Sequence, residues 1–122
     1  MGEREEGKAM SSFYFSYGQD PFFPYQDGWT EVKAPDQYLA VMAFEKFHPK
    51  RPGSRFVNCA LIYTEREWEA TQMAKTGSNF GHGCHELITL HFEHISDTYE
   101  PESLWPVESE EKLTFHCEYL DG

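Results

Sequence analysis

The segment "NFGHGCHE", residues 79–86, contains two histidines, a cysteine and two glycines. Imidazole and thiolate groups are common zinc ligands, and a structural zinc site needs four ligands, usually in two close pairs. The candidate ligands in this segment are His82, Cys84 and His85. Their spacing fits no common zinc pattern, which favours a glycine-containing loop that leads into a strand. We therefore expect no cofactor, with a zinc site as the alternative.

The same segment places a thiol beside imidazoles, which is the combination that cysteine nucleophiles use. No third group that would orient the base is evident, and neighbours on an extended chain, such as Cys84 and His85, point to opposite sides. Cys59 lies in the most apolar stretch of the chain and is expected to be buried and inert. These features leave enzymatic activity open and favour a non-enzymatic protein.

Basic residues gather in one turn of this acidic chain, within "KFHPKRPGSR" (46–55). Arg51 and Arg55 flank a Pro-Gly-Ser sequence whose backbone N–H groups and Ser54 hydroxyl suit a phosphate or a carboxylate. Arg51, Ser54 and Arg55 are therefore the candidate anion-binding residues. The simpler alternative is a structural turn whose arginines pair with the protein's own carboxylates.

A loop with two prolines, "QDPFFPYQDG" (19–28), carries the aromatic residues Phe22, Phe23 and Tyr25. Exposed aromatic side chains are typical of protein interfaces. A proline-containing loop can also fold back and cover the open side of a sheet. The sequence leaves both alternatives open, so the three aromatic residues are candidates for an interaction surface.

The charge of the chain is strongly negative and uneven. The 122 residues include 21 acidic and 10 basic residues, and residues 96–122 hold eight of the acidic and one of the basic residues. This charge disfavours direct nucleic-acid binding, which depends on Lys and Arg. It suits a basic protein partner, or the imitation of nucleic acid by spaced carboxylates. The candidate contact residues in the acidic segment are Glu100, Glu102, Trp105, Glu108, Glu110 and Glu111.

Periodicity and capping signals predict the secondary structure. Alternating apolar residues indicate strands, Asp36 is suited to cap a helix, and Thr64 with Glu67 has the spacing of a capping box. The expected elements are strands at 13–18 and 29–34, a helix at 35–49, a central strand at 56–63, a helix at 64–75 and a strand at 86–92, with a candidate edge strand at 112–120. The order β-β-α-β-α-β predicts an α+β fold, in which a single small sheet has two helices on one face and is partly open on the other.

The chain is expected to form one α+β domain over residues 13–95. A disordered polar leader at 1–12 would precede it, and an acidic linker with the candidate last strand would follow at 96–122. Three cysteines are an odd number, which fits a reducing compartment better than a disulfide framework. No apolar run is long enough for a signal peptide or a membrane span, so we expect a cytoplasmic protein. A homodimer is one way to cover the open sheet face.

Four segments follow one another in the chain: "FYFSYGQDPFFPY", "GWTEVKA", "HPKRPGSRFVNCALIY" and "FGHGCHELI". Together they resemble a family of small, uncharacterised proteins encoded on conjugative elements and prophages of gut Firmicutes. The resemblance covers roughly residues 13–90 and is most specific at the Arg-Pro-Gly-Ser turn followed by Asn-Cys-Ala. It implies a cytosolic accessory protein of a mobile element, a class that often manages the element's DNA or counters host defence. The acidic end of the chain lies outside the resemblance.

These observations predict a small acidic, non-enzymatic binding protein of a mobile genetic element. In the sharper form of this hypothesis, the protein inhibits a host DNA-targeting enzyme, whose basic groove the acidic segment occupies by nucleic-acid mimicry. Two alternatives stay open. One is a nucleic-acid accessory factor that uses the basic turn 46–55, and the other is a small metal-binding protein centred on residues 82–85.

Overall fold

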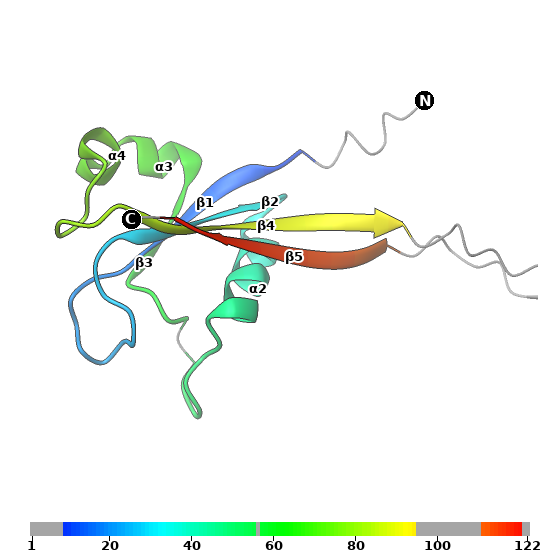
Figure 1. Ribbon diagram of the computed structural model, residues 1–122, viewed down its shortest axis with the longest axis horizontal. Helices are drawn as coiled ribbons and strands as arrows, with labels where there is room; N and C mark the ends of the chain where they lie inside the picture. The colour runs from blue at the N-terminus through cyan, green and yellow to red at the C-terminus, as the bar shows by residue number, and fades with distance from the viewer. Residues whose placement is uncertain (1–8, 56, 95–110, 121–122) are drawn as a thin grey trace, which may run out of the picture.

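The computed structural model describes residues 9–55, 57–94 and 111–120. In this part of the chain, five strands form one mixed sheet and three helices pack against it, which confirms the predicted α+β class (Figure 1). The elements in chain order are β1 (Ser11–Ser16), β2 (Trp29–Ala34), α2 (Gln37–Phe47), β3 (Leu61–Thr64), α3 (Glu65–Glu69), α4 (Gln72–Thr76), β4 (Cys84–His94) and β5 (Glu111–Tyr119). Most of the predicted leader and linker, residues 1–8 and 95–110, lies outside the described ranges.

β1 and β5 both reach beyond the predicted domain at 13–95. β1 begins at Ser11, inside the predicted leader, because Ser12 is buried and its hydroxyl donates to the Glu31 carboxylate at 2.6 Å. The candidate last strand is present, since β5 pairs with β4 along its whole length. None of the helices in the described ranges is long and apolar enough to cross a membrane.

The sheet has the strand order β3-β1-β2-β4-β5. β1 runs antiparallel to β2 and β3, β2 runs parallel to β4, and β4 runs antiparallel to β5. Parallel neighbours need a long crossover, and the crossover from β2 to β4 contains α2, β3, α3 and α4. The centre of the sheet is therefore β2, which has β1 on one side and β4 on the other.

β3 is a short edge strand, which corrects the prediction of a central strand at 56–63. Its paired residues are only Leu61–Thr64. The residues before them bend, because the Asn58 side chain donates to the Pro49 carbonyl oxygen at 2.6 Å. The apolar composition of this stretch reflects a buried bend, with Cys59 in the core, rather than a strand that is covered on both faces.

The predicted helix at 64–75 is divided into α3 and α4. Its predicted capping box is confirmed: Thr64 Oγ1 accepts from the Glu67 N–H at 3.2 Å, and Glu67 Oε1 accepts from the Thr64 N–H at 2.9 Å. The division occurs at Thr71, whose hydroxyl caps α4 by accepting from the Ala74 N–H at 3.1 Å. A threonine hydroxyl competes for backbone donors in this way, so a second N-cap interrupts the helix.

α2 and α3 lie on opposite faces of the sheet, which corrects the prediction of two helices on one face (Figure 1). Phe15 of β1 stacks on Phe44 of α2 with ring centroids 4.4 Å apart, whereas Tyr14 stacks on Trp68 of α3 at 4.5 Å. Adjacent residues of a strand point to opposite faces. The physical reason is that β1 is aromatic on both sides, so each face needs a cover of its own.

The larger core lies on the α2 face. Asp36 caps α2 by accepting from the Leu39 N–H at 2.8 Å, and the small side chains of Ala40 and Ala43 let the helix approach the sheet closely. Phe44 is fully buried in this core. Truncating a buried phenylalanine to alanine costs about 3–5 kcal/mol, so the contact of α2 with the sheet is a major part of the stability.

The α3 face is covered on one side only. Trp68 packs against Tyr14, and its ring centroid lies 4.8 Å from that of Trp29 and 5.6 Å from that of Tyr63. Over β4 and β5, no other helix or strand of the described residues covers this face. The exposed residues there are His91, His116 and Glu118.

Candidate functional site

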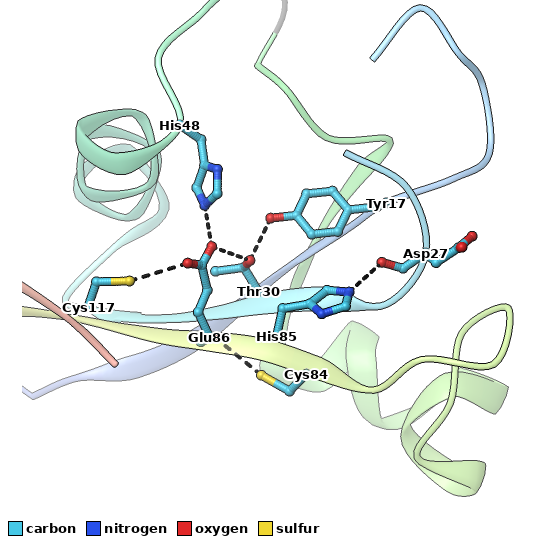
Figure 2. Close-up of polar contacts among 8 residues, drawn as sticks. All are labelled: Tyr17, Asp27, Thr30, His48, Cys84, His85, Glu86 and Cys117. Carbon is cyan, nitrogen blue, oxygen red and sulfur yellow. Dashed lines mark hydrogen bonds and ion pairs between the residues drawn. The ribbon is translucent and has the colours of Figure 1, made fainter. Parts of the chain in front are cut away.

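A bulge at the start of β4 places two consecutive polar residues on one face. Trp29 lies opposite Cys84 and Thr30 lies opposite Glu86, so His85 is the extra residue in β4. His85 and Glu86 therefore both point to the α2 face, while Cys84 points away from it (Figure 2). Bulges re-aim side chains in this way and are frequent beside functional sites.

Glu86 is the centre of a buried network of hydrogen bonds (Figure 2). Its Oε2 atom accepts from Thr30 Oγ1 at 3.0 Å and from His48 Nε2, and its Oε1 atom accepts from the Cys117 thiol at 3.3 Å. The Tyr17 hydroxyl lies 2.5 Å from the Thr30 hydroxyl. It is the donor, because the single Thr30 proton goes to Glu86. We use the name polar cluster for Tyr17, Thr30, His48, Glu86 and Cys117.

The polar cluster joins five parts of the fold. Tyr17 follows β1, Thr30 belongs to β2, His48 caps the end of α2, and β4 and β5 supply Glu86 and Cys117. All of these residues except Cys117 are 8% exposed or less. Burying a carboxylate is unfavourable unless it is paired and hydrogen-bonded, so each donor to Glu86 offsets part of the cost of burying its charge.

Burial and the Glu86–His48 pair determine where the protons of the polar cluster lie. Burial by itself raises the pKa of Glu86, but the hydrogen bond and charge of His48, followed by the Cys117 and Thr30 hydrogen bonds, bring that pKa below its ordinary value. Burial raises the pKa of Tyr17 far above its usual range. Burial and the nearby Glu86 carboxylate raise the pKa of Cys117 to about 12. At neutral pH the polar cluster is thus one carboxylate surrounded by donors, and Glu86 is not free to act as a general base.

The "NFGHGCHE" segment ties β4 to the loop between β1 and β2. The Asn79 side chain donates to the carbonyl oxygens of Tyr17, at 2.8 Å, and Gly28, at 2.9 Å. His85 Nε2 lies 2.8 Å from the Asp27 carbonyl oxygen and donates to it. Gly28 has a φ of +74°, and a Cβ there would lie 2.4 Å from His85 Nε2. The segment is therefore a structural loop that holds the start of β2 against β4.

The three candidate zinc ligands do not converge. His82 is exposed, its ring centroid lies 5.9 Å from that of His85, and Cys84 lies on the other face of β4 (Figure 2). Burial raises the pKa of Cys84, and its thiol donates to the Glu86 carbonyl oxygen at 3.3 Å. Within the described ranges, no group of three or more His, Cys, Asp or Glu residues is arranged to hold a metal ion. Zinc binding at this segment stays an untested alternative.

A second candidate site is an open surface hollow between the loop at 19–28 and the basic turn. Its volume is about 470 Å³. Arg51 is fixed at this hollow, because its guanidinium donates to the Phe22 carbonyl oxygen and lies 4.9 Å from the centre of the Phe22 ring. Neither Arg51 nor Arg55 takes part in an ion pair with a carboxylate of the described ranges. We use the name basic hollow for its lining residues, Phe22, Arg51, Pro52, Gly53, Ser54 and Arg55.

The basic hollow brings together the three residues that the sequence indicated for anion binding. The Ser54 N–H donates to the Arg51 carbonyl oxygen at 2.9 Å, which closes the turn and keeps both ends of it at one surface. Arg55 follows directly and is exposed. The alternative in which both arginines pair with the protein's own carboxylates is not seen among the described residues.

The aromatic residues of the loop at 19–28 have different surroundings. Tyr25 packs on the core, with its ring centroid 4.6 Å from that of His48, so it covers the polar cluster. Phe23 is half-buried and lines a second hollow of about 300 Å³ beside β3. Phe22 is 48% exposed and meets Phe23 edge to face at 5.0 Å. Of the three interaction candidates, Phe22 is the one that solvent reaches most.

Of the acidic interaction candidates, one lies in the described ranges. Glu111 is the first residue of β5. The other candidates lie outside the described ranges: Glu100, Glu102, Trp105, Glu108 and Glu110.

Sequence reasoning did not predict the polar cluster. A signal was available, because Glu86 is in phase with Ile88 and Leu90, which are fully buried, and a carboxylate on an apolar stripe needs a partner. The partners could not be read from the sequence, since Thr30 and His48 lie 56 and 38 residues away from Glu86. Asn79 was missed for the same reason.

Nothing matches this chain in comparisons with protein-family models, with curated proteins and with solved structures. The resemblance to proteins of mobile elements thus stays a prediction. The features that bear on function are the polar cluster, the basic hollow and the edges of the sheet.

Proposed function

We propose that this protein is a small, non-enzymatic binding module whose basic hollow docks a segment of a partner protein that carries a carboxylate beside an apolar side chain. The observation that supports this proposal is the fixed position of Arg51, held between the carbonyl oxygen and the ring of Phe22. A guanidinium that is positioned before binding loses less side-chain entropy when it pairs with a carboxylate. Arginine and aromatic residues are also the types that dominate binding energy at protein interfaces.

The chemistry of the basic hollow favours a single carboxylate over a polyanion. The hollow combines two arginines with the apolar surfaces of Phe22 and Pro52. The chain as a whole carries a net charge of −11, so a nucleic acid would be repelled beyond this small area. At physiological ionic strength charges are screened over about 8 Å, so a local carboxylate contact is compatible with the acidic remainder.

A non-enzymatic role is supported by the state of the polar cluster. Both carboxylate oxygens of Glu86 accept hydrogen bonds, and the thiol of Cys117 keeps its proton. Tyr25 and the burial of His48 separate this carboxylate from solvent. The polar cluster is therefore best understood as the support that holds the loop at 19–28, and with it Phe22, in place.

Selection of a displayed random-peptide library on the purified chain tests the proposal. Enriched peptides should contain an acidic residue next to an apolar one. Arg51→Ala should weaken their binding about tenfold or more, as loss of a central interface arginine does. Arg66→Ala, at an exposed arginine of α3, is the matched control and should leave binding unchanged. Enriched peptides without acidic residues, or with equal affinity for Arg51→Ala, would refute the proposal.

A second candidate function follows from the concentration of acidic residues in 96–122. There the acidic segment is the contact, and the protein inhibits a DNA-targeting enzyme of the host by imitating nucleic acid, in keeping with the resemblance to proteins of mobile elements. Truncation at residue 97 is a poor test, because it removes β5 and the Cys117 contact with Glu86. The better variant changes the four glutamates 100, 102, 108 and 110 to glutamine.

The assay for this second candidate is DNA cleavage by a purified RNA-guided nuclease in the presence of the protein. Inhibition that is lost in the four-glutamine variant and kept in Arg51→Ala would support nucleic-acid mimicry. If the unchanged chain does not inhibit cleavage, nucleic-acid mimicry is refuted for that enzyme class. A gel shift of DNA at low salt would instead favour the nucleic-acid accessory factor that uses the basic turn.

A further inference from the structure

The outer edge of β5 has the properties of a pairing surface. β5 is in register with β4 over nine consecutive pairs, from Glu86–Tyr119 to His94–Glu111, without a bulge. Among the described residues, no strand pairs with its other side. Natural sheets usually protect such edges with charged side chains, prolines, bulges or very short strands. β5 has charged residues near its two ends, but it is nine residues long and has neither a proline nor a bulge.

The backbone groups that face the free edge can be identified. The Leu120 N–H donates to the His85 carbonyl oxygen at 2.8 Å, so Leu120 and His85 form a hydrogen-bonded pair of the antiparallel ladder. Hydrogen-bonded and non-hydrogen-bonded pairs alternate along such a ladder. The even-numbered residues of β5 therefore bond to β4. The N–H and C=O groups of Leu113, Phe115, Cys117 and Tyr119 point to the open side.

We propose that this edge pairs with β5 of a second copy of the chain, antiparallel and with the two-fold axis at Phe115, to form a continuous sheet across the dimer. In this register Lys112 of one copy lies opposite Glu118 of the other, and the two-fold axis produces this pairing twice. Opposite charges on directly facing residues stabilise antiparallel pairs, and like charges destabilise them.

The register is specific, because neighbouring registers lose this complementarity. A shift of two residues keeps the same sides of the strand facing. In one direction it places Lys112 opposite His116, in the other opposite Leu120, and both leave Glu118 without its basic partner. In the proposed register Phe115 faces its own copy, and Leu113 faces Cys117. Phe115 and Cys117 already pack against the α2-face core, so the apolar layer of one copy continues into that of the other.

A second copy accounts for exposed apolar surface at the end of β5. Tyr119 is 77% exposed, although Glu86, its partner in β4, is buried. In the proposed dimer Tyr119 lies opposite Glu111 of the other copy, beside the Lys112–Glu118 pairs. A strand of an unrelated partner would pair with the same backbone groups but would have no reason to match the charges of β5.

Sedimentation equilibrium of the full chain over a range of concentrations tests the proposal. The unchanged chain should form a dimer. Glu118→Lys should weaken the dimer by on the order of tenfold or more, because it replaces two opposite-charge pairs by two like-charge pairs. The double variant Lys112→Glu with Glu118→Lys should restore the dimer. Glu69→Lys, at an exposed glutamate of α3, is the charge-matched control and should not change it.

Each result decides the proposal. A chain that stays monomeric at all concentrations refutes it. So does a dimer that Glu118→Lys leaves intact, or one that the double variant does not restore. Amide hydrogen exchange gives an independent readout: Phe115 and Cys117 should become protected as the dimer forms, whereas Thr114 and His116 should be protected by β4 at every concentration. Arg51→Ala should leave the dimer unchanged, so failure of the peptide-binding proposal is distinguishable from failure of this one.

Discussion

Replacing Glu86 by glutamine tests whether the polar cluster holds the fold together. The substitution keeps the shape and one oxygen acceptor, which can serve Thr30 and His48. The new amide group must then face the Cys117 thiol, where Glu86 Oε1 now accepts. The variant thus loses the negative charge that faces His48 and one accepted hydrogen bond, both in a buried place.

The expected magnitude follows from these two losses. Removing a charged hydrogen bond in a buried site costs about 1.5–3 kcal/mol, and a retained isosteric acceptor keeps the loss below the roughly 3–5 kcal/mol of a fully broken pair. We expect Glu86→Gln to lower the free energy of unfolding by about 2 kcal/mol, or the melting temperature by roughly 6–12 °C for a domain of this size.

Urea unfolding followed by far-UV circular dichroism, at one protein concentration, measures the effect. Glu69→Gln, at an exposed residue of α3, is the control and should change the free energy of unfolding by less than about 0.5 kcal/mol. A Glu86→Gln variant as stable as this control would refute the role assigned to the polar cluster.

The pH dependence of the unfolding free energy shows whether the ionised form of Glu86 is the stabilising one. The pKa of Glu86 in the folded state is below its unfolded value of about 4.5, so its contribution is present above that pH and is lost as pH falls through the folded pKa. The stability difference between the unchanged chain and Glu86→Gln should therefore shrink below pH about 4.5. If the stability difference stayed constant into the acid range, the contact between the Glu86 carboxylate and His48 would not be its cause.

Three further outcomes are expected from the described contacts. Gly28→Ala should destabilise the fold by about 2 kcal/mol or more, because φ is +74° there and a Cβ would collide with the His85 ring. Gly77→Ala is the control: it has a similar φ but open space around it, so it should cost about 1 kcal/mol. Thermal melts of the two variants measure the difference. Burial raises the pKa of Cys59 from 9 to about 12, so its stabilisation is complete below pH 9 and should fade as pH rises toward 12. In urea titrations a Cys59→Ala variant should therefore lose less stability between pH 9 and 12 than the unchanged chain, and an equal loss would contradict this. Alkylation of Cys59 and Cys117 in the folded chain at pH 8 should be slower than that of free cysteine, because their raised pKa values leave little thiolate. Mass spectrometry of iodoacetamide-treated protein measures these rates, and rates equal to that of free cysteine would contradict the prediction.

Local signals predicted the elements of the fold well, and long-range contacts decided the rest. Asp36 and the Thr64–Glu67 capping box act within one helical turn, so the sequence alone located both helix starts. The opposite placement of α2 and α3 depends on Trp68 meeting Tyr14, a contact between residues far apart in the chain. Alternation in β1 contained the hint, because aromatic residues stand at consecutive positions on both of its faces.

The candidate sites also differ in whether local sequence or long-range contacts determine their geometry. Arg51, Ser54 and Arg55 are neighbours in the chain, and a tight turn keeps neighbours together, so the basic hollow was predictable apart from Phe22. The reactive residues of "NFGHGCHE" are also neighbours, but they lie around a bulge that sends Cys84 and His85 to opposite faces. Composition identified the segment, and its geometry could not be inferred without the register of β2 and β4.

The late position of β5 in the chain has a consequence for synthesis on the ribosome. His94 ends β4 and Tyr119 ends β5, so at about 5–20 residues per second β4 exists for roughly one to five seconds before its outer neighbour is made. Until β5 pairs with β4, Glu86 lacks its Cys117 donor, and the apolar residues of β4 adjoin an unpaired edge, which favours aggregation. The segment translated in this interval is the acidic one, and charged residues beside an exposed strand act as gatekeepers against aggregation. We therefore expect the acidic residues between β4 and β5 to limit aggregation of a chain whose last strand has not yet paired.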